Sequence, residues 1–341
     1  MDEIVWLCQI FASYYGLQVF SAHKVRDAWR VQTSSGPKCF KRVKSSLDKV
    51  LFTAAALEYL INNGFSATVP FLKTLQNSYA IELPEGVFYA TEWLPGREGD
   101  FSNLEDIQTA AKVLARIHIA SRGFVPPEGC KKKESWGEIP NAWQKYALQL
   151  TEFRELANAK PNDHFNQLYL SFVDSYQKRV DLALNILNSC DYFGLVESAK
   201  KQGSLCHRDY TYHNFLVDDQ GTLNVIDFDY CTQDIRAYDV GRFIRKVAKH
   251  HKYNTIPVKL LLDAYQSEHP LDRDELIFVL AFVHFPQRFW RLATRYYCKR
   301  PRYTPQYLLS QLEQETQELA LENDFLLQLV AMISREVLLR R

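Results

Sequence analysis

Apolar and polar residues alternate in short runs through the first ninety residues of the chain, which is the pattern of half-buried strands. One pair of runs lies at 27–43 around the turn-forming segment Ser34–Pro37, and a second pair lies at 79–93 around Pro84–Gly86. Between these predicted hairpins, residues 46–63 have helical spacing. This part of the chain is therefore predicted to be a small antiparallel sheet with one helix.

After residue 93 the apolar spacing becomes mostly helical, with helices expected at 102–121 and 165–188. One polar stretch at 204–226 interrupts this region, and its short apolar runs predict a strand–loop–strand–turn–strand insert. We therefore expect an α+β protein of two lobes, with a small sheet lobe at 1–93 and a larger, mainly helical lobe at 94–341.

The composition agrees with two lobes and excludes some classes of function. A chain of 341 residues, 47% of them hydrophobic, exceeds the size at which one core usually stops growing. The net charge of +1 gives no general attraction for nucleic acid, although Arg288–Arg302 is locally basic. Lys131–Lys133 is expected in a solvated surface loop.

The longest apolar run, Leu276–Phe285, is about half the length of a membrane span, so no membrane insertion is expected. The seven cysteines are scattered and form no C-x-x-C pair, which argues against a zinc site or a disulfide framework. The N-terminus lacks the basic start of a signal peptide. These features predict a cytoplasmic protein.

The polar stretch carries the candidate chemistry. Asp209 is followed by Asn214 five residues later and by Asp227 eighteen residues later, each next to a predicted strand. Phosphoryl transfer needs a carboxylate near the accepting hydroxyl and oxygen ligands for Mg²⁺, and this trio can supply both. The alternative is a polar turn in which these side chains only bond the backbone.

The segment His207–Asn214, followed by Ile226-Asp227-Phe228-Asp229, resembles the catalytic and metal-binding segments of protein kinases and of the aminoglycoside phosphotransferase/choline kinase superfamily. The resemblance implies a kinase-like fold and ATP and Mg²⁺ as cofactors. It implies that Asp209 is the catalytic base, that Asn214 and Asp227 are metal ligands and that His207 is a scaffold residue.

Two further segments resemble the nucleotide-binding half of this superfamily. Cys39–Val43 is similar to the third-strand lysine segment, which makes Lys41 the candidate phosphate-binding residue, with Lys38, Arg42 and Lys44 as alternatives. The residues Glu92, Trp93 and Leu94 resemble the hinge that binds adenine through its backbone, and a plain linker between lobes is the alternative.

The short interval between Asp227 and Asp239 distinguishes two branches of the superfamily. It spans twelve residues, and no activation segment or A-P-E-like motif follows, so the platform for a peptide substrate is missing. The chain therefore resembles the small-molecule kinases. Its overall pattern is similar to bacterial spore-coat kinase-like proteins of the CotS type, which implies spore coat proteins as partners and the spore coat as a further location.

The sequence departs from the family pattern at two places. A glycine-rich phosphate loop is expected within Ser21–Trp29, but no glycine is present, so Lys24 and Arg26 would have to hold the phosphates by charge. Thr53 occupies the position of the helix glutamate that normally pairs with the lysine. The nearest acid in that helix is Glu58, which lies on a different face.

These observations favour an enzyme that phosphorylates a small hydroxyl-bearing molecule with Mg-ATP. The alternative is a weakly active or inactive kinase-fold protein that serves as a structural component of the spore coat. The two departures from the pattern favour this alternative. Nucleic-acid binding is a third and less favoured class.

Overall fold

The structure is a computed structural model that describes residues 3–299 and 302–339. Its contacts divide the chain into two compact units. The first unit comprises Met1–Ser135 and Ala199–Asp234, and the second comprises Trp136–Ser198 and Ile235–Arg341. The predicted lobe boundary at residues 93 and 94 is a different division and stays a prediction.

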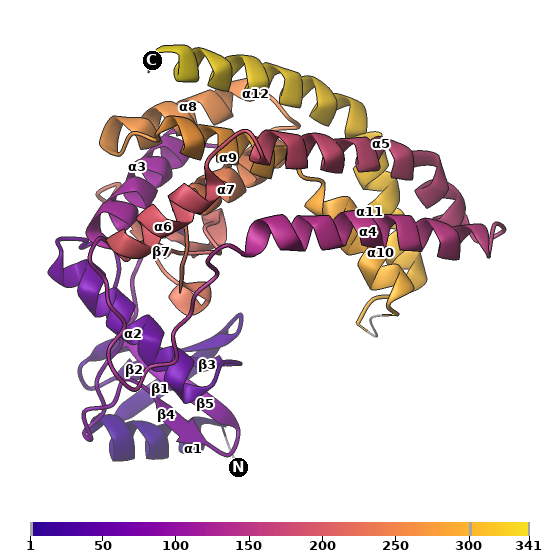
Figure 1. Cartoon of the computed structure of the whole chain (residues 1–341). Coiled ribbons are helices and arrows are strands. Elements are labelled where there is room, and N and C mark those ends of the chain that lie inside the picture. Colours follow the sequence, from indigo (N-terminus) through magenta and orange to yellow (C-terminus); the bar gives the residue numbers. More distant parts are fainter. Residues whose placement is uncertain (1–2, 300–301, 340–341) are drawn as a thin grey trace. The chain divides into compact units, whose positions relative to one another are not determined.

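The first unit is built on a five-stranded antiparallel sheet with the strand order β1-β2-β3-β5-β4 (Figure 1). Its strands are β1 (Val19–Val25), β2 (Ala28–Thr33), β3 (Gly36–Val43), β4 (Ile81–Leu83) and β5 (Gly86–Glu92). Both predicted hairpins and helix α2 (Leu47–Asn62) are present. The small antiparallel sheet is thus confirmed.

The sequence analysis did not predict helix α1 (Glu3–Ile10) or the π-helical turn Phe11–Tyr15 that follows it. Leu7 and Ile10 of α1 form a buried cluster with Phe40 of β3 and Phe88 of β5. Successive side chains of a strand point to opposite faces of the sheet. Lys41, next to Phe40, therefore points away from this cluster.

The rest of the first unit carries the predicted insert. A three-stranded sheet joins β6 (Arg97–Glu98), β8 (Phe215–Val217) and β9 (Leu223–Val225), and a two-stranded sheet joins β7 (Leu205–Cys206) to β10 (Thr232–Gln233). Short 3-10 turns cover Tyr212–Asn214 and Phe228–Tyr230. Helix α3 (Leu104–Ala120) begins at the N-cap Asn103, whose side chain accepts the amide of Glu105.

The second unit is helical. Its interior includes the ion pair of Arg179 with Glu322 and the stacked rings of Trp143 and Phe285. The helices are α4 (Glu138–Asn158), α5 (His164–Leu187), most of α6 (Tyr192–Gln202), α7 (Ala237–His250), α8 (Thr255–Glu268), α9 (Arg273–His284), α10 (Gln287–Tyr297), α11 (Pro305–Gln317) and α12 (Leu319–Leu339). A sheet-bearing part and a helical part confirm the α+β prediction. Within the described residues, no helix combines the length and apolarity needed to cross a bilayer.

Candidate active site

Lys41 lies at the centre of a charged cluster in the first unit. Its Nζ is 2.8 Å from Oδ2 of Asp227 and 3.0 Å from Oδ2 of Asp229, and the hydroxyl of Tyr89 donates to Asp229 at 3.1 Å. Burial alone would lower the pKa of Lys41, but the two carboxylates outweigh it and raise this pKa. The lysine therefore stays charged and holds both aspartates.

Asp229 takes the place of the glutamate that the family pattern puts on the helix. Burial raises the pKa of Asp229, and the charge of Lys41 opposes this shift. On α2, Thr53 is buried, and its hydroxyl donates to the carbonyl of Lys49 and accepts a hydrogen bond from Lys133, each at 3.2 Å. The partners of Lys41, which the sequence left in doubt, thus both come from the Asp227–Asp229 segment.

Lys38, the first alternative to Lys41, has a different partner. It lies opposite Glu92 in the β3–β5 register, and its Nζ is 2.7 Å from both carboxylate oxygens of Glu92. The ammonium group of Lys38 is therefore engaged at the hinge, while Lys41 is the lysine of β3 that reaches Asp227.

His207 joins the catalytic loop to the strand that precedes Asp227. It is fully buried, and its Nε2 lies 3.1 Å from the carbonyl oxygen of Ile226, while the Asp209 amide donates to its Nδ1 at 3.2 Å. These partners assign the ring proton to Nε2. This arrangement agrees with the scaffold role implied for His207.

Asn214 fixes the other end of the same loop. Its Nδ2 donates to the carbonyl oxygen of Asp209 at 2.8 Å, and its main-chain carbonyl accepts the amide of Ile226 at 2.9 Å. Hydrogen bonds to main-chain groups thus connect Asp209, Asn214 and Ile226, the residue before Asp227. Arg208, which has a φ of 68°, forms an ion pair with the buried Asp234 at 2.8 Å. This ion pair is a further contact that holds the loop.

Asp227 is the most constrained of the predicted site residues. Its φ of 63° lies in the left-handed region, which non-glycine residues rarely adopt and which is frequent at functional sites. Oδ2 binds Lys41, whereas Oδ1 is buried and has no hydrogen-bond partner within 3–299 and 302–339. A buried carboxylate oxygen without a donor is a suitable ligand for a hard cation such as Mg²⁺.

These residues line a cavity of about 290 Å³ in the first unit. Lys41, Asn214 and Asp227 are on its wall, together with Glu92, Trp93 and Leu94, the residues predicted to form the hinge. Asp209 is half-buried, and its carbonyl oxygen accepts a hydrogen bond from Asn214, which lines the cavity. All of the residues predicted for the site are thus found in one region.

The hinge shows which backbone groups are engaged. The amide of Trp93 donates to the carbonyl of Pro37 at 3.0 Å, which extends the β3–β5 ladder by one residue pair. The side chain of Glu92 points to Lys38. The carbonyl oxygen of Glu92 accepts the hydroxyl of Thr91 at 2.9 Å.

The expected phosphate loop is a tight hairpin instead. Most of Ser21–Trp29 belongs to β1 and β2, which are joined by only Arg26 and Asp27, since Val25 pairs with Ala28. Arg26 has the left-handed φ of 57°, a conformation that glycine or asparagine usually supplies. Two residues therefore form the tip of this hairpin, and neither is a glycine.

Arg26 at this tip is held by charge. Its guanidinium forms an ion pair with Glu98 and lies 3.4 Å from Nδ1 of His213, which is itself 3.4 Å from Glu98. All three side chains line the cavity and are about half exposed. Lys24, the other predicted cation, lies over the ring of Trp29 at 5.3 Å.

The comparisons with known proteins follow this geometry. A family model described as the phosphotransferase enzyme family matches residues 17–274. The chain belongs to this family. Among curated proteins, spore coat protein S of Bacillus subtilis (strain 168) is 24% identical over 278 residues, which cover 81% of this chain and 79% of that protein.

Solved phosphotransferase structures share the fold. An aminoglycoside phosphotransferase from Alicyclobacillus acidocaldarius has a TM-score of 0.82 and 22% identity, with 93% of each chain covered. Spectinomycin phosphotransferase, solved with ADP and spectinomycin, has a TM-score of 0.64 and 15% identity, with 94% of this chain and 98% of that chain covered. The predicted kinase-like fold is confirmed.

The family pattern did not identify every residue of the cluster. It missed Asp229 as the partner of Lys41, Tyr89 as a donor to Asp229, and Lys133, which was expected in solvent. Only Asp229 had a signal in the sequence, as the second acid of the Asp-Phe-Asp segment.

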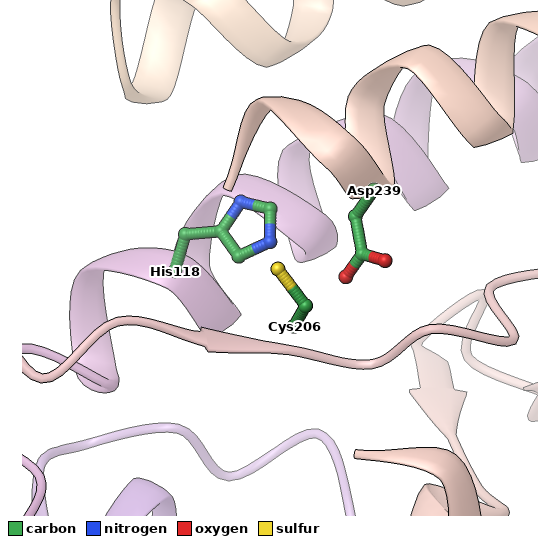
Figure 2. Close-up of side chains that lie close together, drawn as sticks. All are labelled: His118, Cys206 and Asp239. Carbon is green, nitrogen blue, oxygen red and sulfur yellow. The ribbon is translucent and has the colours of Figure 1, made fainter. Parts of the chain in front are cut away.

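His118 on α3 and Cys206 on β7 lie deeper in the first unit (Figure 2). Both are almost completely buried, and the nearest ligand atoms of the two side chains are within 4.8 Å of each other. The thiol of Cys206 also lies 3.7 Å from the carbonyl oxygen of Asp234. Both residues are therefore part of the buried core of the first unit.

Proposed function

We propose that this chain transfers the γ-phosphoryl group of ATP to a hydroxyl group of a small molecule. The observation that carries the proposal is the cluster at Asp227. One carboxylate oxygen binds the charged Lys41, and the other is buried without a donor among the described residues. Asn214 lines the same cavity.

In this proposal each residue has a distinct role. Asn214 and Asp227 hold Mg²⁺, which when bound neutralises charge on the phosphates. Lys41 binds a phosphate oxygen, and the backbone of Glu92 and Leu94 binds adenine. Asp209 takes the proton of the accepting hydroxyl as its oxygen forms a bond to the γ-phosphorus. The bond from phosphorus to the bridging oxygen breaks, and ADP leaves with that electron pair.

The acceptor and the cellular setting are also proposals. The named neighbours are phosphotransferases, one of them solved with spectinomycin, which agrees with a small hydroxyl compound as acceptor. Another, amicoumacin kinase, was solved with AMP-PNP and Ca²⁺, which agrees with a nucleotide and a divalent cation. The likeness to spore coat protein S suggests that the protein is made in the cytoplasm and associates with spore coat proteins.

The decisive experiment compares the wild type with Asp209→Asn. Loss of a general base should lower turnover by about 10²–10⁴-fold. Thermal stabilisation by Mg-ATP should persist, because Asp209 lies outside the nucleotide-binding residues. ADP release is measured with a panel of hydroxyl compounds and with water as acceptor. Asp219→Asn, on an exposed turn, is the matched control. Equal turnover in wild type and Asp209→Asn would exclude this mechanism.

A second candidate is an inactive kinase-fold component of the spore coat. It is favoured by the glycine-free hairpin, whose tip is closed by the ion pair of Arg26 with Glu98. This candidate predicts no thermal shift at millimolar Mg-ATP, together with self-association or binding to isolated coat material. A saturable shift that requires Mg²⁺ would exclude it.

A further inference from the structure

Lys133 has an unusual environment for a residue in a lysine-rich loop. Its Nζ donates to the carbonyl oxygen of Asp229 at 2.8 Å and to the hydroxyl of Thr53 at 3.2 Å. It also lies 5.6 Å from the centre of the Phe52 ring. One ammonium group therefore contacts both helix α2 and the turn that contains Asp229.

The backbone explains how Lys133 reaches this position. Its carbonyl accepts the amide of Gln233 at 2.7 Å, and the amide of Ser135 donates to the carbonyl of Gln233 at 3.0 Å. Glu134 pairs with Gln233 in parallel orientation. The segment thus lies along β10, which follows the Asp229 turn directly, and Lys133 points back toward that turn.

The hydroxyl of Thr53 is suited to this contact. It donates its proton to the carbonyl of Lys49 at 3.2 Å, one helical turn earlier. Its lone pairs are then available to Lys133. A glutamate at position 53 would place a charged carboxylate at this point of the helix. With Thr53 there, Lys133 instead donates to two neutral oxygens, the Thr53 hydroxyl and the Asp229 carbonyl.

Burial of Lys133 has an electrostatic consequence. Burial lowers its pKa, and the nearby Cys231 and Asp229 oppose this shift. An amine that is removed from water needs hydrogen-bond acceptors to offset the loss of hydration. The Asp229 carbonyl and the Thr53 hydroxyl are such acceptors, whereas the neighbouring Lys132 is exposed.

We propose that Lys133 is a positioning residue that ties α2 to the Phe228–Tyr230 turn and so holds Asp229 against Lys41. Lys133 fixes the main chain of Asp229, while Lys41 and Tyr89 fix its carboxylate.

With Asp229 fixed, Asp227 needs to supply only one oxygen to Lys41, and its other oxygen is left for a cation. This step rests on the proposed function. The link between α2 and the turn does not depend on it.

The test uses the full chain and compares Lys133→Met with Lys132→Met. Hydrogen exchange without nucleotide should become about tenfold faster in α2 and in Phe228–Cys231 for Lys133→Met, since two hydrogen bonds from a charged donor are lost. Lys132→Met should exchange like the wild type. Unchanged exchange in both segments of Lys133→Met would overturn the proposal.

A milder variant covers the case in which Lys133→Met does not fold. Thr53→Val removes the acceptor on α2 and should speed exchange in α2 more than in the turn. Unchanged exchange in α2 of Thr53→Val would by itself contradict the link. Where Lys133→Met folds, the effects of the two substitutions on α2 should not add in the double variant, because both remove the contact between Lys133 and Thr53. Full additivity would show that the two residues act independently and would contradict the link.

The second readout is the Mg²⁺ concentration that half-saturates ADP binding. It should rise about tenfold in Lys133→Met and stay unchanged in Lys132→Met, an effect of the size seen when groups behind metal ligands are removed. A purely structural lysine would leave this value unchanged. If the wild type binds no Mg-ADP, the proposed function fails, and the exchange experiment still decides whether Lys133 joins the two segments.

Discussion

The cluster of Lys41, Asp227 and Asp229 differs from the β1–β2 hairpin in how far its charged side chains are exposed. In the cluster of Lys41, Asp227 and Asp229, the side chains are 10%, 28% and 20% exposed. In the contact of Arg26 with Glu98 they are 53% and 46% exposed. Exposed ion pairs are weakened by water and salt, and buried ones much less so.

This difference separates two functions within one cavity. The groups proposed for phosphoryl transfer are held by the protein itself, since hydrogen bonds connect His207, Asn214 and Ile226. Arg26, the hairpin cation expected to contact the phosphates in addition to Lys41, is bound to acidic and imidazole side chains that a phosphate could replace. The transfer site is therefore preorganised, whereas the phosphate site requires an exchange of partners.

The largest effect is expected from the preorganised side, in Asp227→Asn. The change removes the carboxylate proposed to hold Mg²⁺, and a bound metal contributes several kcal/mol to phosphoryl transfer, so turnover should fall on the order of 10³-fold. The fold should persist because Lys41 keeps its pair with Asp229. Turnover and the melting temperature are measured together.

Asp219→Asn is again the control, since this carboxylate is exposed. If Asp227→Asn kept its turnover at saturating Mg²⁺, the buried oxygen would have no role in metal binding. The proposed difference in function between the Lys41 cluster and the β1–β2 hairpin would then be unsupported.

The sequence could place the residues proposed for transfer near one another because they are close along the chain. His207, Asp209 and Asn214 lie within eight residues, and their spacing alone places them on one loop between two strands. The alternation of β3 likewise puts Lys41 on the face opposite Phe40. Local patterns of this kind need no knowledge of the tertiary fold.

The contacts that the sequence could not predict join distant segments. Asp229 pairs with Lys41, which lies 188 residues earlier, and Lys133 reaches Thr53 across 80 residues. The hairpin tip was missed for a different reason. Arg-Asp is not a typical two-residue turn, so nothing in the sequence marked Arg26 as a residue with positive φ.

Arg26→Asn tests the hairpin side. Asparagine tolerates the left-handed conformation, so the turn should survive while the charge is lost. A hydrogen bond to a charged group contributes about 1.5–3 kcal/mol. Because Arg26 must first leave Glu98, affinity for Mg-ATP should fall about tenfold, near the lower end of that range.

Affinity for AMP should be unchanged in this variant, because AMP lacks the outer phosphates, and titration calorimetry compares the two nucleotides. Lys24→Asn removes a cation from the same hairpin without changing the turn and should have less effect. Equal losses in both variants would mean that the hairpin acts by its overall charge rather than through Arg26.

The smallest effect, and one of opposite sign, is expected for Glu98→Gln. This change removes the carboxylate that competes with phosphate for Arg26, so the arginine becomes available. An exposed ion pair contributes about 0.2–1 kcal/mol, so Mg-ATP should bind up to about fivefold more tightly.

The gain in Mg-ATP affinity of Glu98→Gln should disappear in high salt, because salt already screens the pair in the wild type. It should also be absent when Arg26 is asparagine. Weaker binding of Mg-ATP by Glu98→Gln would mean that Glu98 holds Arg26 in its working position rather than away from the phosphates.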